Sequence, residues 1–286
     1  MATRTAEQAN TDGPQLNLGA PRWRVARAGL RLGALVSDGI ALGYRHGFDS
    51  GPMLDYVYRN QARGKLIIGR LADRIYLDQV GWRAIRARRA LLERTLLQVI
   101  EARRARGERT HIVDIAAGPG RYLLELVAAT DRGDLSVLCR DLDPAGLAQG
   151  QALAASLGLR DARFERGDAT DPGDLARIAP RPDLVVASGV YEIITDDAAI
   201  RRSMRGVRAL LPDDGAFVFT TQIAHPQLDL IANTLPNRHG EPWIMGTRPA
   251  RAVETWAREA GFAATRTWVA EHGLFAVTKA EVRSGK

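Results

Sequence analysis

The sequence has little cysteine and lysine and no long hydrophobic run. Cys139 is the only cysteine among 286 residues, so no disulfide can form within one chain. This usage predicts a reducing, cytoplasmic compartment. No uncharged apolar run reaches the roughly 18 residues that a spanning helix needs. The polar N-terminal stretch lacks the apolar segment of a secretory signal, so we expect neither a membrane span nor a cleaved leader.

The positive charge is almost all arginine and is concentrated near the N-terminus. Residues 1–110 carry 20 basic and 10 acidic side chains, whereas residues 111–286 carry 20 and 23, which accounts for the net charge of +7. This asymmetry favours a negatively charged partner, such as phosphate, a carrier-tethered or otherwise anionic substrate, an anionic lipid surface or RNA. A solvated helical face is the alternative interpretation.

The first part of the chain predicts a tail followed by helices. Residues 1–20 are polar, contain glycine and proline and show no periodicity, so we expect a disordered tail. Residues 21–109 show helical patterns and predict an N-terminal helical lid or substrate region. Within it, the expected helix over 22–44 carries three arginines on one face. A basic amphipathic helix can lie on a membrane surface, but the four glycines of this stretch favour packing on its own domain.

From residue 110 onward, short apolar runs alternate with helical patterns. Such alternation predicts a Rossmann-like, doubly wound α/β domain over 110–286, with a mostly parallel sheet. The last two strands are joined by a short hairpin loop, so we expect seven strands with an antiparallel last strand. The expected strands cover 111–116, 135–141, 162–168, 183–189, 215–221, 262–271 and 273–279.

A glycine-bearing turn follows the first of these strands. Gly118 and Gly120 allow the backbone to approach a ligand closely, and the helix that follows offers unpaired N–H groups. A dinucleotide fingerprint would need glycine or alanine at the position of Leu123, and no GxxxxGK[ST] loop is present. The turn therefore argues against a nicotinamide, flavin or nucleoside triphosphate ligand.

Carboxylates end the next two strands. Asp141 can accept hydrogen bonds from both ribose hydroxyls, and Asp168 can accept one from an adenine amine, because strand ends in such a sheet border one crevice. Ser188 and Gly189 close the fourth strand with small residues. S-adenosylmethionine (SAM) has a diol, an adenine and an ammonium group but no phosphate, and it suits this arrangement.

These motifs resemble those of class I SAM-dependent methyltransferases. DIAAGPG is similar to their first motif, with Ala116 in place of its first glycine; DLDP, GDAT and DLVVASGVYEI are similar to the ribose, adenine and fourth motifs. The resemblance implies cofactor binding by Asp114, Ala116, Gly118, Pro119, Gly120, Asp141, Leu142, Asp168, Ala169, Ser188 and Gly189.

A closer resemblance covers nearly the whole chain. GFDSGPMLDYVYRN, GRLADRIYLDQVGWRAIRARR and HPQLDLIA…HGEPWIM are similar to a bacterial methyltransferase family. Members of this family are sometimes fused to an α/β-hydrolase or a phosphatidyltransferase-like domain. The fusions imply lipid or alcohol metabolism.

Candidate residues for the chemistry lie outside the cofactor motifs. His225, in the insert 223–247, is the expected general base, and Tyr191, after the fourth strand, is expected to position the acceptor. The alternatives are that His225 caps the following helix and that Tyr191 is a core residue. The spacing of histidines shows no metal-ligand pattern. The expected substrate-binding residues are Tyr56, Tyr58, Arg86, His239 and Trp243.

The sequence thus predicts a SAM-dependent methyltransferase acting on a small-molecule or lipid-like acceptor. The alternatives are an RNA or protein methyltransferase, a SAM enzyme with non-methyl chemistry, and a non-catalytic SAM-binding or membrane-surface module. Nucleic acid is not the expected partner, because no RNA-binding module or stacking aromatic platform is present. ASGV replaces the [DN]PP[YF] run of adenine-N6 enzymes. The oligomeric state stays open.

Overall fold

The structure, a computed structural model, describes residues 13–130 and 133–283. The chain forms two compact units. Unit 1 comprises Met1–Arg86 and Ala224–Thr247, and unit 2 comprises Ala87–Ile223 and Arg248–Lys286. The boundary lies within helix α5 (Val80–Arg104), whereas the change of sequence pattern comes after residue 109. The insert after the fifth strand belongs with the N-terminal helices.

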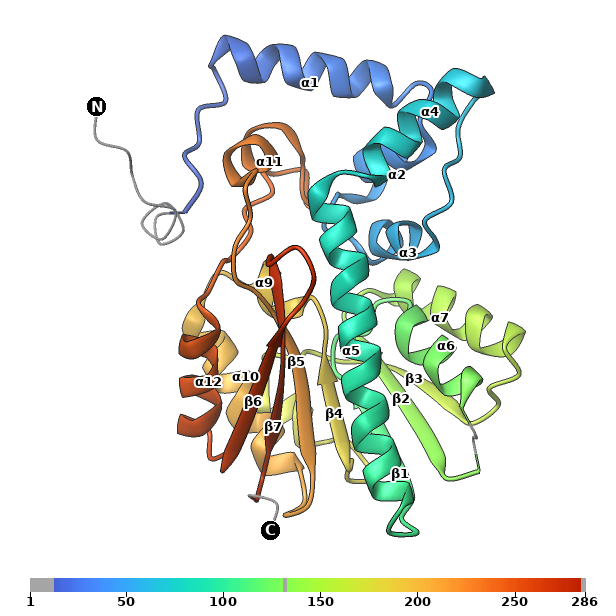
Figure 1. The fold of residues 1–286 in the computed structure, drawn as a ribbon, viewed down its shortest axis with the longest axis vertical. Coiled ribbons are helices and arrows are strands. Elements are labelled where there is room, and N and C mark those ends of the chain that lie inside the picture. Colours follow the sequence, from blue (N-terminus) through green and yellow to red (C-terminus); the bar gives the residue numbers. More distant parts are fainter. Residues whose placement is uncertain (1–12, 131–132, 284–286) are drawn as a thin grey trace. The chain divides into compact units, whose positions relative to one another are not determined.

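Unit 2 contains a seven-stranded sheet with the order β3-β2-β1-β4-β5-β7-β6 (Figure 1). β7 is antiparallel to both β5 and β6, and the other neighbouring strands are parallel. The predicted fold class is confirmed. The strands are β1 (Thr110–Asp114), β2 (Leu135–Asp141), β3 (Ala162–Arg166), β4 (Leu184–Ala187), β5 (Ala216–Gln222), β6 (Ala264–Val269) and β7 (Phe275–Glu281).

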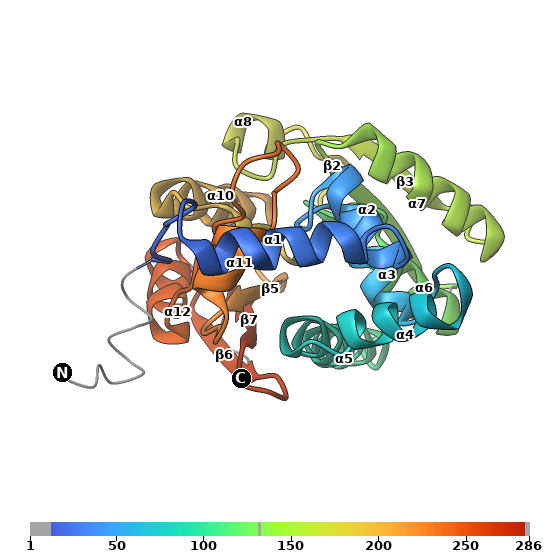
Figure 2. The ribbon, with the colours of Figure 1, turned by 90° about the horizontal axis from the view of Figure 1, so that it is seen from above.

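Helices cover both faces of this sheet, and Figure 2 shows α10 and α5 on opposite sides of it. Alternate residues of β5 point to opposite faces, as strand geometry requires. Phe217 and Phe219 pack with Met204 and Trp256 in one core. The helices of unit 2 besides α5 are α6 (Arg121–Ala129), α7 (Pro144–Ser156), α8 (Pro172–Leu175), α9 (Val190–Ile193), α10 (Asp197–Leu210) and α12 (Ala250–Glu259).

Unit 1 is helical, and the single helix expected over 22–44 is wrong. α1 (Pro21–Gly33) ends early and α2 (Asp38–His46) starts anew, because the Ser37 hydroxyl accepts from the Ile40 N–H and caps the second helix. The other helices of this unit are α3 (Gly51–Arg59), α4 (Leu66–Leu77), the start of α5 and α11 (Leu228–Thr234).

Asp73 of α4 joins the helices of unit 1. Its carboxylate is fully buried and accepts from Ser37 Oγ at 2.5 Å, from the Gly39 and Arg63 N–H groups at 2.8 Å, and from the Tyr56 hydroxyl. Four hydrogen-bond donors compensate the buried charge of this carboxylate. If the carboxylate were removed, each donor would be left without an acceptor, which would lower the stability of the fold. Asp73 therefore fixes α2, α3 and the 60–65 loop around α4.

The described part of the expected tail is hydrogen bonded to α11. The Gln15 N–H donates to Asp229 Oδ1 at 2.9 Å, and the Asn17 N–H donates to Asn233 Oδ1 at 2.7 Å. Residues 1–12 of the expected disordered tail lie outside the described residues. No helix within residues 13–130 and 133–283 is long and apolar enough to cross a bilayer.

Candidate functional site

Asp114, the last residue of β1, holds the loop that follows this strand. Oδ1 of Asp114 accepts from the Ala116 N–H at 3.1 Å, and Oδ2 accepts from the Tyr122 hydroxyl at 2.5 Å. The side chain is fully buried, and burial raises its pKa to about 7. Because both carboxylate oxygens already accept from the loop and from α6, the structure supports a loop-positioning role for Asp114, and its direct cofactor contact stays a prediction.

Two glycines shape the loop. Gly118 and Gly120 have φ angles of 53° and 66°, the left-handed region that favours glycine. Ala116 is not among the residues with positive φ, so its methyl group fits where the methyltransferase motif has glycine. A Cβ on Gly150 of α7 would lie 2.9 Å from the Pro119 carbonyl oxygen, so α7 packs tightly against the loop.

The two expected adenosyl-binding carboxylates lie at one edge of the sheet. The Gly167 N–H donates to the Asp141 carbonyl at 3.1 Å, which joins the ends of β2 and β3. Asp141 Oδ2 accepts from the Gly118 N–H at 2.7 Å and Oδ1 accepts from the Asp143 N–H at 2.9 Å. Each oxygen keeps a lone pair for a ribose hydroxyl. Leu142 is half exposed beside them.

Asp168 retains acceptor capacity as well. Its Oδ1 accepts from the Thr170 N–H and hydroxyl at 2.8 and 2.7 Å. Within the described parts of the chain, no group donates to Oδ2, and the residue is half-buried. Neighbouring Ala169 is buried. A glycine loop and two carboxylates at one strand edge therefore fit an adenosyl group without phosphate.

A buried polar chain lies near the ends of β4 and β5. Gly189, at φ 81°, donates its N–H to Thr220 Oγ1 at 2.9 Å, and the Thr220 hydroxyl donates to Glu192 Oε1 at 2.7 Å. Arg88 Nη1 of α5 pairs with the same oxygen at 3.2 Å. Glu192 is only 4% exposed, so the arginine and the threonine compensate its buried charge.

Three buried polar atoms of this region have no partner among the described residues. They are Glu192 Oε2, Ser188 Oγ and Gln222 Nε2. Thr220 and Gln222 alternate on β5, so they share the sheet face on which Arg88 lies over the Phe275 ring. Unmet hydrogen-bonding capacity in the interior of unit 2 costs free energy, and a polar ligand would recover it.

Tyr191 lies on the opposite side of the sheet and is a core residue. Its hydroxyl is 2.9 Å from Ser203 Oγ, and its ring packs edge-on against Phe217 and Phe219. Burial raises the pKa of this phenol. The expected acceptor-positioning role of Tyr191 does not fit this placement. Glu192, one residue later in the four-residue helix α9, is directed instead toward Arg88 and Thr220.

His225 is buried in unit 1. Its Nδ1 accepts from the Gln227 N–H at 3.1 Å, and burial lowers its pKa to about 4. A Cβ on Gly81 would lie 2.8 Å from Nε2, so the ring packs closely against the start of α5. α11 has no side-chain cap, so His225 does not cap that helix but binds the N–H of Gln227, the residue before it; the role of general base stays a prediction.

The expected substrate-binding residues all belong to unit 1, and most are already engaged there. Tyr56 donates to Asp73, and Arg86 donates to the Leu77 carbonyl at 3.0 Å. Trp243 stacks on Trp82 with ring centroids 6.1 Å apart. His239 is exposed in a turn and Tyr58 is half-buried. The structure does not gather the five side chains around one point.

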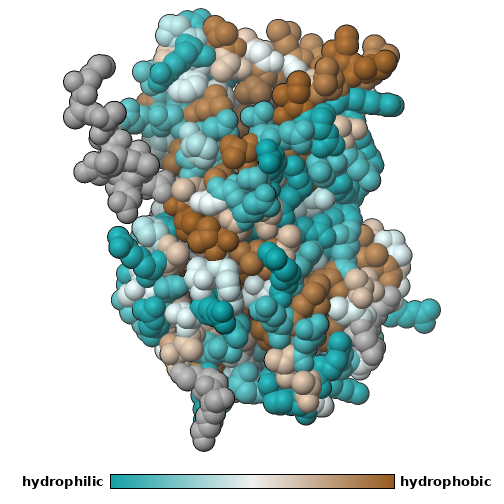
Figure 3. All heavy atoms as spheres, viewed as in Figure 1, coloured by the Kyte–Doolittle hydropathy of each residue, from teal (hydrophilic) through white to brown (hydrophobic). Residues whose placement is uncertain are grey.

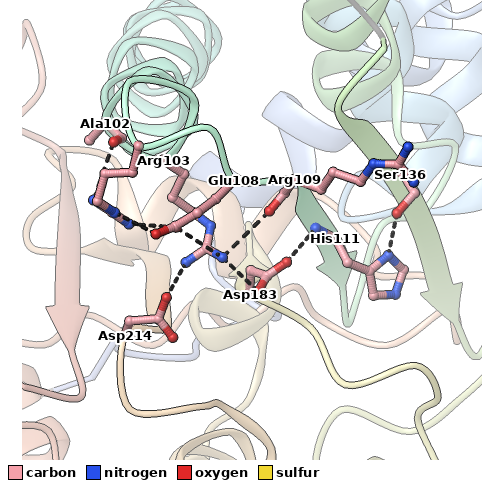
Figure 4. A network of polar contacts seen from close by, with 9 residues as sticks. Ala102, Arg103, Glu108, Arg109, His111, Ser136, Asp183 and Asp214 are labelled. Atoms are coloured by element: carbon pink, nitrogen blue, oxygen red, sulfur yellow. Dashed lines mark hydrogen bonds and ion pairs between the residues drawn. The ribbon is translucent and has the colours of Figure 1, made fainter.

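Asp183, which precedes β4, lies at the amino end of the strand and serves packing. Figure 4 shows its carboxylate between Arg103 of α5 and the His111 N–H of β1, at 2.8 and 2.7 Å. Arg103 also contacts Asp214 at 2.8 Å. Asp183 therefore anchors α5 to the sheet and takes no part in the cofactor site.

Comparisons with known proteins agree with this geometry. The family model described as "Putative methyltransferase" matches residues 2–282. An uncharacterized protein of Escherichia coli, YnbC, is 38% identical over 260 residues, which cover 90% of this chain and 44% of YnbC. The chain thus spans less than half the length of this relative.

Solved structures share the fold. The crystal structure of a "possible exported protein" from Bordetella parapertussis has a TM-score of 0.63 at 18% identity, covering 92% of this chain and 98% of that one. The carbon methyltransferase DszA has a TM-score of 0.55 at 18% identity, covering 69% of this chain and 54% of that one.

The strand order, the glycine loop and the paired carboxylates define a class I methyltransferase, an enzyme whose cofactor is SAM. The chain belongs to the family described as "Putative methyltransferase", which its model matches over nearly the full length.

Proposed function

We propose that the chain transfers a methyl group from SAM to a small-molecule or lipid-like acceptor. The observation that carries the proposal is the hydrogen bond from the Gly118 N–H to Asp141 Oδ2, which joins the glycine loop to the carboxylate beside it. The family match supports the reaction type. The acceptor class rests on the basic N-terminal region, which suits an anionic or lipid-like molecule.

SAM would supply a sulfonium-activated methyl group. Asp141 would accept from the ribose hydroxyls, Asp168 Oδ2 would accept from the adenine amine, and the backbone of 116–120 would approach the rest of the cofactor. Asp114 would hold that loop in place from the interior. These residues bind and orient; none of them needs to exchange a proton.

Glu192 would act as the general base toward the acceptor. Its Oε1 is held by Arg88 and Thr220, so Oε2 has a fixed direction and a free lone pair. A carboxylate in this position can accept the proton that a hydroxyl or acidic carbon loses on methylation. Ser188 Oγ and Gln222 Nε2 would orient the same polar group. We place Glu192 ahead of His225, whose Nδ1 already accepts a backbone N–H.

The two parts of the chain would divide the work of binding. Residues 110–286 would carry the cofactor, and residues 21–109 would select the acceptor. In unit 1, the Tyr44 hydroxyl and Trp243 Nε1 are buried donors without acceptors among the described residues, which supports a polar ligand there. The single cysteine, buried and free, is consistent with a cytoplasmic location. Peripheral membrane contact through residues 22–44 is also kept as a proposal.

Two measurements test the proposed function. Calorimetry with S-adenosylhomocysteine tests the cofactor half. Incubation of the protein with methyl-labelled SAM and metabolite or lipid extracts, read by mass spectrometry, tests the acceptor half. Cofactor binding together with one labelled methyl on a small molecule or lipid supports the proposal. Labelling of RNA or protein instead, or binding without any transfer, would overturn it.

A further inference from the structure

Helix α4 is apolar on both its inner and its outer side. Gly69, Tyr76 and Leu77 are buried together with Asp73 on the side that faces the other helices of unit 1. The opposite side is also aliphatic. Leu66, Ile67, Ile68, Leu71 and Ile75 are between 58% and 84% exposed. A helix that is hydrophobic all round normally has a second apolar neighbour, and none of the described residues covers this side.

The end of α1 extends this surface. The Lys65 N–H donates to the Val36 carbonyl at 3.0 Å, which places the turn after α1 beside the start of α4. Leu32 and Leu35 are 67% and 64% exposed there. Figure 3 shows hydrophobic residues gathered at the upper right, where Figure 1 places the start of α4. We call Leu32, Leu35, Leu66, Ile67, Ile68, Leu71 and Ile75 the aliphatic tip.

Uncompensated cations border the aliphatic tip. Lys65 and Arg70 are exposed and form no ion pair within the described residues. The only acid within α4 is Asp73, which is buried and directed inward. The surface therefore combines large aliphatic side chains with unpaired positive charge, and no exposed carboxylate of α4 opposes it.

The composition of the tip favours a lipid surface over a protein partner. Protein interfaces are enriched in Trp, Tyr, Phe and Met and depleted in lysine, whereas the tip consists of leucine and isoleucine beside Lys65. Aliphatic side chains with flanking cations match an interfacial helix that enters the boundary between headgroups and acyl chains of an anionic bilayer. A contiguous exposed apolar surface is unusual on an isolated soluble chain and marks a docking site.

We propose that the aliphatic tip docks this protein on anionic membranes, with Ile67, Leu71 and their neighbours inserted and with Lys65 and Arg70 at the headgroups. This surface shares Leu32 and Leu35 with the 22–44 region named above, but its main contributor is α4, so it gives the proposed membrane contact a different centre. It requires no methyl-transfer activity, so its test is independent of the proposed function.

Vesicle flotation of the full chain tests this proposal. We expect binding to phosphatidylcholine vesicles that contain phosphatidylglycerol, weak binding to phosphatidylcholine alone, and a decrease with added salt. Ile67→Ser with Leu71→Ser should lower the partition coefficient about tenfold or more, because two inserted aliphatic chains are lost. On anionic vesicles, Lys65→Glu with Arg70→Glu should lower the partition coefficient about fivefold or more for each cation replaced. The matched control is Val269→Ser, because Val269 is 57% exposed on β6.

A fluorescence measurement distinguishes insertion of the side chains into the bilayer from electrostatic attraction to its surface. Cys139 is buried, so Ile67→Cys can be labelled selectively with a polarity-sensitive dye, with Val269→Cys as the matched control. Docking predicts a blue shift on anionic vesicles at position 67 and none at position 269. Equal shifts at both positions would overturn the proposal, and so would a wild-type protein that does not bind vesicles. A dimer would also overturn it if Ile67→Ser with Leu71→Ser abolished the dimer while vesicle binding persisted.

Discussion

The backbone N–H of Gly118 donates to Oδ2 of Asp141 across 2.7 Å, and this contact unites two parts of the sequence 23 residues apart. Gly118 adopts a left-handed φ that orients its N–H toward β2, and Asp141 ends that strand. Because the Gly167 N–H donates to the Asp141 carbonyl, Asp168 comes to the same edge. The proposed adenosyl site therefore has a defined geometry that can be tested without knowing the acceptor.

Asp141→Ala should weaken the binding of S-adenosylhomocysteine by roughly 1–3 kcal/mol, the range for losing hydrogen bonds to a charged group. Calorimetry measures the change. Asp171→Ala is the control, since Asp171 also accepts a backbone N–H, from Gly173 at 2.8 Å, but at the start of α8. Equal affinity in the Asp141 variant and the wild type would remove Asp141 from the ribose site.

Glu192→Gln should lower turnover by about 10²–10⁴-fold, the usual contribution of a general base, while the cofactor affinity stays the same. The amide keeps the size of the side chain and can still accept from Arg88 and Thr220. Incorporation of labelled methyl under saturating cofactor measures turnover. The control is Glu259→Gln, the same substitution at an exposed carboxylate of α12 that pairs with Arg201. Retained turnover in the glutamine variant would contradict the assignment.

Local sequence patterns predicted the sheet and the cofactor loop because each depends on neighbours in the chain. Alternation of strands and helices predicted the α/β class, and the glycine turn with an acid at the next strand end predicted that Gly118 and Asp141 lie close together. The same patterns missed the break after Gly33, because the cap at Ser37 and the contact of Val36 with Lys65 bring together residues that periodicity does not connect.

The acceptor side was harder to predict for a physical reason. Successive side chains of a helix point about 100° apart, and in α9 this rotation directs Tyr191 into the core and Glu192 toward Arg88. The Glu192–Arg88 pair joins residues 104 positions apart. One signal was available in the sequence: Glu192 lies in an apolar segment after a buried strand, and a charged residue that becomes buried there needs a partner.

His225 should make the stability of the fold depend on pH. Its pKa is about 4 in the folded chain and about 6.5 in the unfolded chain, so the unfolded chain binds more protons below about pH 6.5. Stability therefore falls as the pH falls from about 6.5 to about 4, by up to about 3 kcal/mol. His225→Asn can still accept from the Gln227 N–H but does not titrate, so it should lose less stability between about pH 7 and about pH 5.

Urea unfolding at the two pH values measures this difference, with His239→Asn as the control because His239 is exposed. Parallel loss of stability in the wild type and the His225 variant would show that the imidazole is not buried as described. The same variant bears on catalysis: if His225 is the general base, methyl transfer is lost even at neutral pH, where its neutral form is already fully populated.

Two glycine substitutions in helices should have opposite effects. A Cβ on Gly29 of α1 would meet nothing within 4 Å, so Gly29→Ala should stabilise the fold by about 0.5–1 kcal/mol. A Cβ on Gly150 of α7 would lie 2.7 Å from Phe164 Cε1 and 2.9 Å from the Pro119 carbonyl oxygen. Gly150→Ala must therefore displace α7 or the loop, at a cost of about 1–3 kcal/mol.

Whether Phe164 or the loop at Pro119 is displaced decides how the substitution affects cofactor binding. Phe164 can shift within β3, but Pro119 lies between Gly118 and Gly120, whose backbone belongs to the proposed adenosyl site. If the loop yields, Gly150→Ala loses affinity for S-adenosylhomocysteine as well as stability, whereas Gly29→Ala leaves the affinity unchanged. Calorimetry and urea unfolding on both variants measure the two effects. A Gly150 variant with wild-type stability and affinity would mean that α7 does not press on the loop, and the tight approach inferred for it would be wrong.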